Sequence, residues 1–519
     1  MADQEHIIVR LLEDTAEKMP DMPAVRWIEK KEIPEKKYGE LNTDRTRIAN
    51  ALYARGFEGC KVALIGTSSY QWIASYFGIV GSRMTAVPLD PMLPFEELCD
   101  LLNRSDSEAL FVSPKLLSII GQVKKECPKV RLFVVLSDEP AQEEGVLSFA
   151  EFMSEQDETP LTVEKRPDAD DVCTIIFTSG TTGKSKGVML TQRNVYDDVV
   201  NVVVNFEPGT TMLSVLPIHH AYCLVMEWLK GFSLGATIYI NDSLLHMLRN
   251  IAKVKPRILV MVPLMIEVIY KRLKADESKP TREVAIEAFG ENLEYIFSGG
   301  AHLDPSYIYA IEEYGIKVCE GYGMSECSPT ISSNGEIGNR PGSVGKVLTN
   351  MQIRFVDGEV QVKGSNVMKG YYKMPKETEE AFTDGWLRTG DLGRLDEDGY
   401  LYITGRLKNL IILSNGENVS PEEIESKLLA NELVGEAVIT GENNGLCARI
   451  YPDADYVEKA GLPEAEVQAK LQAILDEYNK SQPSYRAITA LVVRKYPFIK
   501  NSTKKIVRAK ADIDEAPQE

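Results

Sequence analysis

The chain has 519 residues, 44% of them hydrophobic and 26% charged, and its 58 Lys and Arg against 77 Asp and Glu give a formal charge of −19. This length corresponds to about three or four domain-sized units, and the composition excludes disorder on a large scale. An acidic chain repels phosphate backbones, so a general nucleic-acid-binding surface is excluded and no nucleic-acid partner is expected.

The start of the chain and its cysteines indicate a reduced, cytoplasmic protein. The first twenty residues lack the basic segment and apolar core of a secretory signal. The most apolar stretch, residues 258–266, is too short to cross a bilayer. We therefore expect no transmembrane segment, which leaves only peripheral membrane contact. The eight cysteines contain no CxxC pair, and we expect buried thiols rather than disulfides or a zinc site.

Up to about residue 320, short apolar runs alternate with segments of helix length. Buried strands separated by helices indicate a mainly parallel sheet system covered by helices. Thr191 and Asp304 are good N-cap residues and predict the starts of long helices. The runs expected to be strands are residues 61–66, 131–136, 172–177, 236–240, 257–262 and 293–297.

The pattern changes after Arg340-Pro341-Gly342. Asp-Gly pairs at residues 357–358, 384–385 and 398–399 predict antiparallel hairpins as far as Gly405. The sequence SPEE at residues 420–423 predicts a capping box and a helix running toward Leu429. Three further strands are expected at residues 437–440, 448–451 and 488–494.

These patterns together predict an α/β fold with two domains. The large N-terminal domain, residues 1–405, is expected to hold helix-covered, mainly parallel sheets and a small β-barrel-like subdomain at about 341–405. The small C-terminal domain, residues 406–519, is expected to be an α+β unit.

The strongest local signal is the loop TSGTTGKSKG at residues 178–187, which follows the apolar run 172–177. Its backbone N–H groups, its hydroxyls and the ammonium groups of Lys184 and Lys186 can all point at phosphate oxygens. A Walker A motif would need glycine where Thr178 stands, so the spacing excludes that motif. On composition alone, a polar surface hairpin is the alternative.

The loop resembles the phosphate-binding loop of the AMP-forming adenylating enzymes, the superfamily of acyl-CoA synthetases, peptide-synthetase adenylation domains and firefly luciferases. Within it, the chain is most similar to bacterial long-chain fatty acid–CoA ligase-like proteins. The resemblance implies ATP, Mg²⁺ and coenzyme A as cofactors. Five further segments follow in the family's order: SGGA at 298–301, GYGMSE at 321–326, WLRTGD at 386–391, GRLK at 405–408 and NSTKKIVR at 501–508.

The resemblance also implies which residues contact the nucleotide. Glu326, a hard oxygen donor, is expected to hold Mg²⁺, Asp391 to bind the ribose hydroxyls, and Arg406 to reach ribose or phosphate. The ring of Tyr322 is expected to lie against adenine. Read without these motifs, Tyr322 would be a core residue, Glu326 a surface charge and Asp391 a turn cap. The remaining expected ATP contacts are Thr178 (also catalytic), Ser179, Gly180, Thr181, Thr182, Gly183, Lys184, Lys186, Gly299, Gly300, Ala301, Gly321, Gly323, Met324 and Ser325.

Lys505 is the predicted catalytic lysine, because the family carries one just before Ile-x-Arg and KIVR stands at residues 505–508. A cation there would stabilise negative charge that develops between the attacking carboxylate and the α-phosphate. Lys504 replaces the family's usual glycine, so Lys504 is the alternative. Lys408 takes the place of the family's hinge residue, about which a mobile small domain would turn between two steps. The structural alternative for Lys505 is a flexible surface lysine, and for Lys408 a linker lysine without a special role.

The segment LPIHHAY at residues 216–222 resembles the border of the acyl pocket, with His220 as a catalytic residue near the substrate carboxylate. No acidic residue occurs from 216 to 225, which disfavours an α-amino acid whose ammonium would stay unpaired. We expect activation of a medium- or long-chain fatty acid and transfer to coenzyme A. An acyl carrier protein as acceptor, and a catalytically silent binding protein, are the alternatives.

Overall fold

The computed structural model describes residues 4–29, 32–141, 143–154, 158–178, 184–274, 278–335, 338–413, 418–442, 445–483, 486–500 and 506–516. The chain folds into two compact units, which are described separately. The first comprises Met1–Ile353 and Val362–Arg388, and the second Arg354–Gln361 and Thr389–Glu519. The predicted domain boundary after residue 405 stays a prediction.

A nine-stranded sheet forms one half of the first unit. Its central strands β14, β13, β12, β10, β11 and β1 run parallel. At one edge β2 pairs antiparallel with β1, and at the other β15 pairs antiparallel with β14 and β16 with β15. The order across the sheet is β16 (Lys346–Val347), β15 (Thr330–Ser333), β14 (Lys317–Gly323), β13 (Tyr295–Ser298), β12 (Ile258–Met261), β10 (Thr211–Ser214), β11 (Thr237–Ile240), β1 (Pro23–Trp27) and β2 (Glu35–Lys37).

An eight-stranded sheet forms the other half. Its strands run parallel except β9, which pairs antiparallel with β8 on one side and with the edge strand β19 on the other. The six apolar runs predicted as strands coincide with β3, β6, β8, β11, β12 and β13, so the mainly parallel α/β prediction is confirmed. The order is β19 (Gly370–Tyr371), β9 (Lys186–Thr191), β8 (Val172–Thr178), β4 (Thr85–Leu89), β3 (Lys61–Ile65), β5 (Ser107–Val112), β6 (Leu132–Val135) and β7 (Leu147–Ser148).

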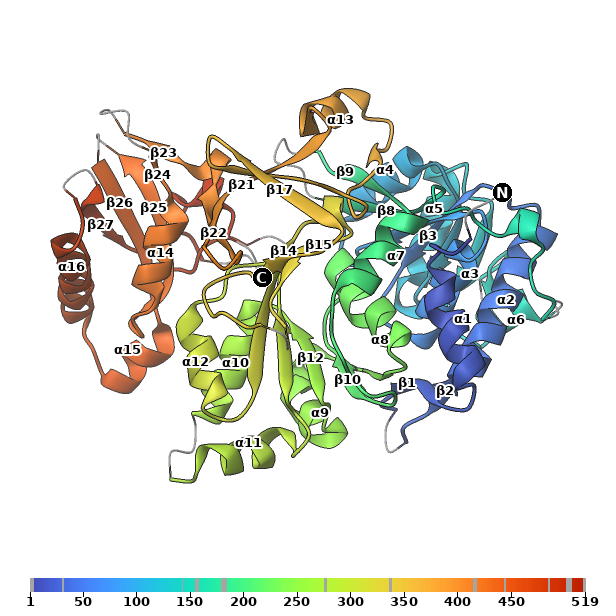
Figure 1. Ribbon diagram of the computed structural model, residues 1–519, viewed down its shortest axis with the longest axis horizontal. Helices are drawn as coiled ribbons and strands as arrows, with labels where there is room; N and C mark the ends of the chain where they lie inside the picture. Colours follow the sequence, from blue (N-terminus) through green and yellow to red (C-terminus); the bar gives the residue numbers. More distant parts are fainter. Residues whose placement is uncertain are drawn as a thin grey trace. The chain divides into compact units, whose positions relative to one another are not determined.

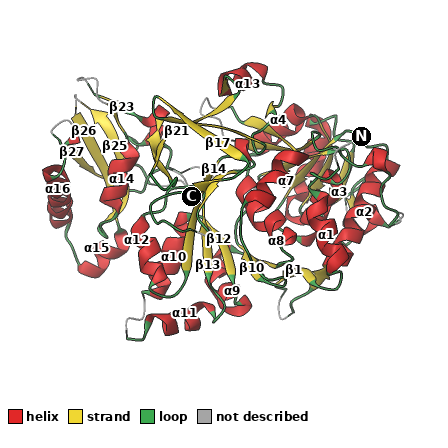
Figure 2. Ribbon diagram, viewed as in Figure 1, coloured by secondary structure: helices red, strands yellow, loops and turns green. Residues whose placement is uncertain are grey.

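Helices pack beside both sheets. The α3 helix contacts β3, β4 and β8, while α9 contacts β10 and α12 contacts β14 (Figures 1 and 2). Thr191 and Asp304 cap α7 and α12 as predicted, although these helices have only 10 and 8 residues. The helices are α1 (Val9–Lys18), α2 (Tyr38–Ala54), α3 (Tyr70–Val80), α4 (Phe95–Ser105), α5 (Ile120–Glu126), α6 (Phe149–Met153), α7 (Gln192–Asn201), α8 (Lys230–Ser233), α9 (Met247–Val254), α10 (Pro263–Leu273), α11 (Thr281–Phe289), α12 (Pro305–Glu312) and α13 (Pro375–Ala381), with a π-helix at Tyr222–Leu229.

The chain passes between the units within a five-stranded sheet, of order β17-β18-β21-β20 with β22 on β21. The predicted hairpin turns are confirmed: Asp357-Gly358 and Asp384-Gly385 both have positive φ, as a type I′ turn requires. The strands are β17 (Met351–Val356), β18 (Glu359–Gly364), β20 (Phe382–Thr383), β21 (Trp386–Leu395) and β22 (Leu401–Arg406).

The second unit contains a three-stranded sheet with α14 and α16 packed on it through Ile424, Leu428, Leu471 and Leu475. The three strands expected here are confirmed, each somewhat longer or shorter than predicted. The elements are β23 (Ile411–Ile412), β24 (Asn418–Val419), α14 (Pro421–Leu429), β25 (Val434–Glu442), β26 (Gly445–Pro452), α15 (Ala454–Ala460), α16 (Glu464–Lys480) and β27 (Ile488–Val493).

The predicted capping box at the start of α14 is wrong, although the helix itself is confirmed. Ser420 is the N-cap residue but its side chain accepts no bond from the first helical turn. Its Oγ instead donates to the carbonyl oxygen of Thr404 in β22 at 2.8 Å. The same Oγ also lies 3.1 Å from Oε2 of Glu422, and a Cβ at Gly405 would lie 2.0 Å from it, so β22 passes close to the serine hydroxyl.

All eight cysteines are buried, as expected. In the described parts of the chain, no helix combines the length and the apolar character needed to cross a membrane.

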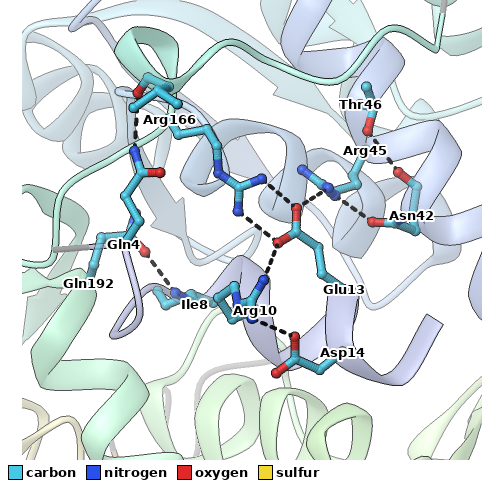
Figure 3. A network of polar contacts seen from close by, with 11 residues as sticks. Gln4, Ile8, Arg10, Glu13, Asp14, Asn42, Arg45, Thr46, Arg166 and Gln192 are labelled. Atoms are coloured by element: carbon cyan, nitrogen blue, oxygen red, sulfur yellow. Dashed lines mark hydrogen bonds and ion pairs between the residues drawn. The ribbon is translucent and has the colours of Figure 1, made fainter. Parts of the chain in front are cut away.

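A charged cluster joins the N-terminal helix to the rest of the first unit (Figure 3). Oε1 of Glu13 on α1 accepts from Arg45 of α2 at 2.6 Å, and both carboxylate oxygens accept from Arg166, at 2.9 and 2.7 Å. The Arg45 side chain is only 8% exposed. Burial raises the pKa of Glu13, but the hydrogen bond from Arg166 and the charges of Arg45 and Arg166 bring it below its ordinary value.

We predict that Glu13→Gln lowers the free energy of unfolding by about 3 kcal/mol at pH 7, because it leaves Arg45 buried without its counter-charge. Since the folded-state pKa of Glu13 is lowered, its contribution is present above the unfolded pKa and is lost as pH falls through the folded value. Urea unfolding at pH 7 and at acid pH measures both effects. Asp14→Asn is the control: Asp14 meets only half-exposed Arg10, so the loss should stay below about 1 kcal/mol. Equal losses in the two variants would contradict the prediction.

Candidate functional site

The predicted phosphate loop connects β8 to β9. Thr178 ends β8 and pairs in register with Lys186, the first residue of β9, so the two ends of the loop are held side by side. Lys184 is exposed and Lys186 is half-buried. Five residues with predicted ATP contacts lie outside the described residues, and those contacts stay predictions: Ser179, Gly180, Thr181, Thr182 and Gly183.

A second predicted segment follows β13. Gly299, Gly300 and Ala301 stand at the carboxyl ends of the parallel strands, the edge where open α/β sheets bind ligands. Gly300 has a φ of +82°, which glycine adopts without strain. A Cβ at Gly299 would lie 2.7 Å from Cζ of Tyr222, so the ring of the acyl-pocket segment packs directly on this backbone. The nucleotide and acyl segments predicted separately are therefore in contact.

Glu320, which belongs to none of the predicted motifs, holds the loop that follows this segment. It pairs with Ser298 in the sheet register and its buried carboxyl accepts backbone N–H bonds from Leu303 and Gly342. Burial raises its pKa to about 8. The side chain thus ties the loop after β13 to β14 while carrying little charge at neutral pH.

The predicted adenine-binding segment is partly a strand. Gly321, Tyr322 and Gly323 end β14, where Tyr322 pairs antiparallel with Ser332 and is half-buried. A Cβ at Gly323 would meet the carbonyl oxygen of Pro329 at 1.9 Å, so only glycine fits there. Met324 and Ser325 then lead into the short 3₁₀ turn Ser325–Cys327, which carries Glu326.

Glu326 and Lys186 are brought together by a third residue, Tyr371 of β19. The Tyr371 hydroxyl donates to Oε1 of Glu326 at 2.9 Å, and Nζ of Lys186 lies 4.8 Å from the centre of the tyrosine ring. Glu326 is 9% exposed and Tyr371 7%. Burial and the neighbouring Glu326 raise the pKa of Tyr371 well above its ordinary value, so the hydroxyl remains a donor. Tyr371 belongs to none of the predicted motifs, since only the pairing of β19 with β9 brings it here.

A buried carboxyl group on α7 holds the surrounding loops. Asp198 accepts from the backbone N–H of Thr330 at 3.2 Å, from its Oγ1 at 3.3 Å and from Nδ2 of Asn366 at 2.7 Å. Ser328 donates to the carbonyl oxygen of Asn366 at 2.8 Å. Burial raises the pKa of Asp198 well above its ordinary value, although the bonds from Thr330 oppose this. The loop after Glu326 and the segment before Tyr371 are thereby fastened to one helix.

The histidine pair of the acyl-pocket segment precedes the π-helix Tyr222–Leu229. Burial and the neighbouring His220 lower the pKa of His219 to about 3, so His219 is neutral. Its ring centre lies 4.2 Å from that of His220, and its Nε2 is 3.8 Å from Oδ1 of Asp90. His220 is half-buried. Its predicted contact with a substrate carboxylate stays a prediction.

Glu227 is the first carboxyl after the acid-free stretch 216–225, and it is fully buried within the π-helix. Its Oε2 accepts from Ser214 of β10 at 2.7 Å and from the Cys223 thiol at 3.0 Å. Burial raises its pKa to about 8, so it is mostly protonated at neutral pH. Because it faces β10, it offers no ionised partner to a substrate ammonium group.

Asp391, Arg406 and Lys408 gather at the end of β22 in the second unit. Asp391 and Arg406 pair in register, and Nε of Arg406 donates to Oδ1 of Asp391 at 2.9 Å. Lys408 lies in the 3₁₀ turn Leu407–Asn409, where burial and the charge of Arg406 lower its pKa. The structure therefore assembles these three predicted residues, while their contacts with nucleotide remain predictions.

Lys505 and Lys504 lie outside the described residues. On either side, Lys500 and Ile506 form an antiparallel bridge. Three of the seven basic residues from 494 to 510 make structural contacts: Arg494 donates to three backbone carbonyls, Lys500 lies 2.6 Å from Glu436, and Arg508 pairs with Glu425 of α14. Part of the positive charge noted in the sequence thus serves the fold.

The chain is similar to known proteins in sequence and in fold. Residues 12–372 match the family of AMP-binding enzymes, and residues 408–514 match the AMP-binding enzyme C-terminal domain. The long-chain-fatty-acid–CoA ligase FadD15 of Mycobacterium bovis is 27% identical over 446 residues, covering 76% of this chain and 74% of that protein. The oxalate–CoA ligase of Arabidopsis thaliana is 31% identical over 471 residues, covering 86% of each chain. ATP-bound MatB from Rhodopseudomonas palustris is 25% identical with a TM-score of 0.80, covering 98% and 100%.

We predict that Glu227→Gln changes how the stability of the protein depends on pH. The folded-state pKa of about 8 lies above the ordinary 4.5, so the stability that Glu227 contributes is fully present below pH 4.5 and is lost as pH rises toward 8. The variant does not titrate, so its stability relative to the wild type should rise by up to about 1.4 kcal/mol per pH unit across this window. Urea unfolding at several pH values measures the slope. Parallel curves for the two proteins would contradict the prediction.

Proposed function

The chain belongs to the AMP-binding enzyme family as an AMP-forming acid–CoA ligase, and we propose that its acid is a medium- or long-chain fatty acid. In the first step the carboxylate attacks the α-phosphorus of ATP, the bond to the bridging oxygen breaks, and pyrophosphate leaves. In the second step the thiol of coenzyme A attacks the acyl carbonyl and AMP leaves.

The contact of Lys186 with Glu326 through Tyr371 is the observation that supports the proposed reaction with ATP. It places a cation at one end of the phosphate loop and a carboxylate next to it, as binding of a metal–triphosphate requires. In the described part of the chain, no cluster of three acidic, His or Cys side chains forms a metal cage. A single carboxylate suits Mg²⁺, which usually keeps several waters and binds phosphate oxygens. When bound, Mg²⁺ would be held by Glu326 and would neutralise phosphate charge.

An apolar acid is favoured by the side chains around the histidine pair. Residues 216–229 contain no Lys or Arg to pair with a second carboxylate of the substrate. Their only acidic residue is Glu227, which is buried, mostly protonated and bonded to Ser214. An unpaired charge on the substrate would be costly to bury here, so a neutral hydrocarbon tail fits best.

Coenzyme A is the proposed acceptor, with the phosphopantetheine thiol of an acyl carrier protein as the alternative. A competition assay with free coenzyme A against a carrier domain decides between them, and a strong carrier preference would favour the alternative. We also propose that the enzyme works in the cytoplasm, on the strength of its eight buried cysteine thiols.

Acid-dependent ATP–pyrophosphate exchange tests the function directly. The panel should run from oxalate and aromatic acids to saturated fatty acids of increasing length, followed by thioester formation with coenzyme A. We expect the highest exchange rates with fatty acids. A preference for short dicarboxylates would overturn the proposed acid but not the ligase, and no exchange with any acid would favour a catalytically silent binding protein.

We predict that Lys505→Ala slows adenylate formation by about 10²–10³-fold, because a cation is removed where transition-state charge develops. Thioester formation from preformed acyl-adenylate should survive much better, since that step has no pyrophosphate to release. Single-turnover assays of each half-reaction measure the two effects. Lys504→Ala is the matched control and should leave both steps close to wild type. A larger defect in Lys504→Ala would move the assignment to Lys504, and equal loss of both half-reactions would contradict the division of labour.

We predict that Lys408→Pro impairs thioester formation more than adenylation, by about tenfold or more, because a fixed φ prevents the backbone change that a hinge must absorb. Lys408→Ala keeps the backbone free and removes the charge, so it should affect the second step much less. The ratio of the two half-reaction rates is the measurement. A first step more impaired than the second in Lys408→Pro would remove the hinge assignment.

A further inference from the structure

We propose that Tyr371 is the positioning residue that aligns Glu326 and Lys186 for the metal–triphosphate, an inference that rests on the proposed function. The sheet register explains its place. Tyr371 of β19 stands opposite Val188 of β9, and Lys186 is two residues from Val188 along the strand. Side chains two residues apart on a strand share a face, so Lys186 is the diagonal neighbour of Tyr371.

The strand carrying Tyr371 is held firmly on both sides. The backbone N–H of Lys369 donates to Met189 at 3.0 Å and that of Tyr372 to Gly187 at 2.7 Å. The N–H of Tyr371 itself donates to Oγ1 of Thr378 in α13 at 2.9 Å. The ring therefore has little freedom to move relative to the end of the phosphate loop.

The Tyr371 hydroxyl selects one of the two carboxylate oxygens of Glu326. It occupies Oε1, and in the described residues no second hydrogen-bond donor reaches the side chain. Oε2 is left to meet a divalent cation or a water in its hydration shell. The backbone N–H of Met368 also donates to the carbonyl oxygen of Glu326 at 2.8 Å, so the same segment fixes both the position and the rotation of the carboxylate.

The face of the tyrosine ring meanwhile attracts the Lys186 ammonium. At 4.8 Å from the ring centre the contact is within cation–π range. It keeps the lysine beside Glu326 without forming a direct ion pair that would neutralise both groups. Lys186 therefore remains available to the phosphate, and Glu326 to the cation.

Substitution of Tyr371 separates these two roles. Tyr371→Phe keeps the ring and its attraction for Lys186 but removes the hydroxyl, whereas Tyr371→Leu removes both. The probe is Mn²⁺ binding to the full-length protein with α,β-methylene-ATP and no acid, followed by electron paramagnetic resonance. We expect the dissociation constant of Mn²⁺ to rise about tenfold in Tyr371→Phe. In Tyr371→Leu, affinity for the nucleotide without metal should fall as well.

Tyr372→Phe is the matched control, because the adjacent hydroxyl donates to Asp106 at 2.6 Å instead of to Glu326. It should bind Mn²⁺ as the wild type does. Combining Tyr371→Phe with Glu326→Gln tests whether Tyr371 acts through Glu326. If it does, Tyr371→Phe should hardly change the dissociation constant of Mn²⁺ in the Glu326→Gln background. Unchanged Mn²⁺ binding in Tyr371→Phe, or full additivity of the two substitutions, would overturn the proposal. Since no acid is present, these outcomes are distinct from failure of the proposed fatty-acid activity.

Discussion

The hydrogen bonds to the buried carboxyl group of Asp198 are the constraint on which the candidate site depends. One side chain on α7 receives bonds from Thr330, just beyond Glu326, and from Asn366, just before β19. These two segments are separated in the sequence, and neither is part of a long helix or strand. Unsatisfied polar groups would be costly at such depth, so the loops are held in one arrangement. Glu326 and Tyr371 meet because their supporting segments share this anchor.

The carboxyl ends of the parallel strands and the antiparallel strands β9 and β19 position the other residues of the candidate site. The parallel strands β12, β13 and β14 deliver Gly299, Gly300 and Glu320 at their carboxyl ends. The antiparallel return of β9, joined by β19, delivers Lys186 and Tyr371. In a purely parallel sheet, a long crossover connection would follow β8. Here β9 instead pairs antiparallel with β8, so the two ends of the phosphate loop lie side by side.

The sequence alone predicted the strands and the local segments, because apolar runs, Asp-Gly turns and glycine-rich loops are local signals. It did not reveal Tyr371, Asp198 or Glu320. Each of these acts through a partner more than ten residues away, and a tyrosine or carboxylate outside a motif has no local signature. The capping box at Ser420 failed for the same reason, since a strand distant in sequence takes the serine hydroxyl. Lys505, which the family resemblance identified most sharply, lies outside the described residues.

The formal charge of −19 overstates the negative potential around the candidate site. Burial raises the pKa of Asp198 well above its ordinary value. Glu227 and Glu320 also lie buried in the first unit, and burial raises the pKa of each to about 8, so both are mostly protonated at neutral pH. Two carboxyl groups that would repel a triphosphate therefore act as hydrogen-bonding groups instead. Glu326 is different, because its single donor among the described residues is a tyrosine hydroxyl and its remaining oxygen can meet a cation. A site for a polyanion in an acidic protein needs this separation: the carboxyls of Glu227 and Glu320 are mostly protonated and hold the structure, while the carboxyl that would bind metal has an oxygen that can meet a cation.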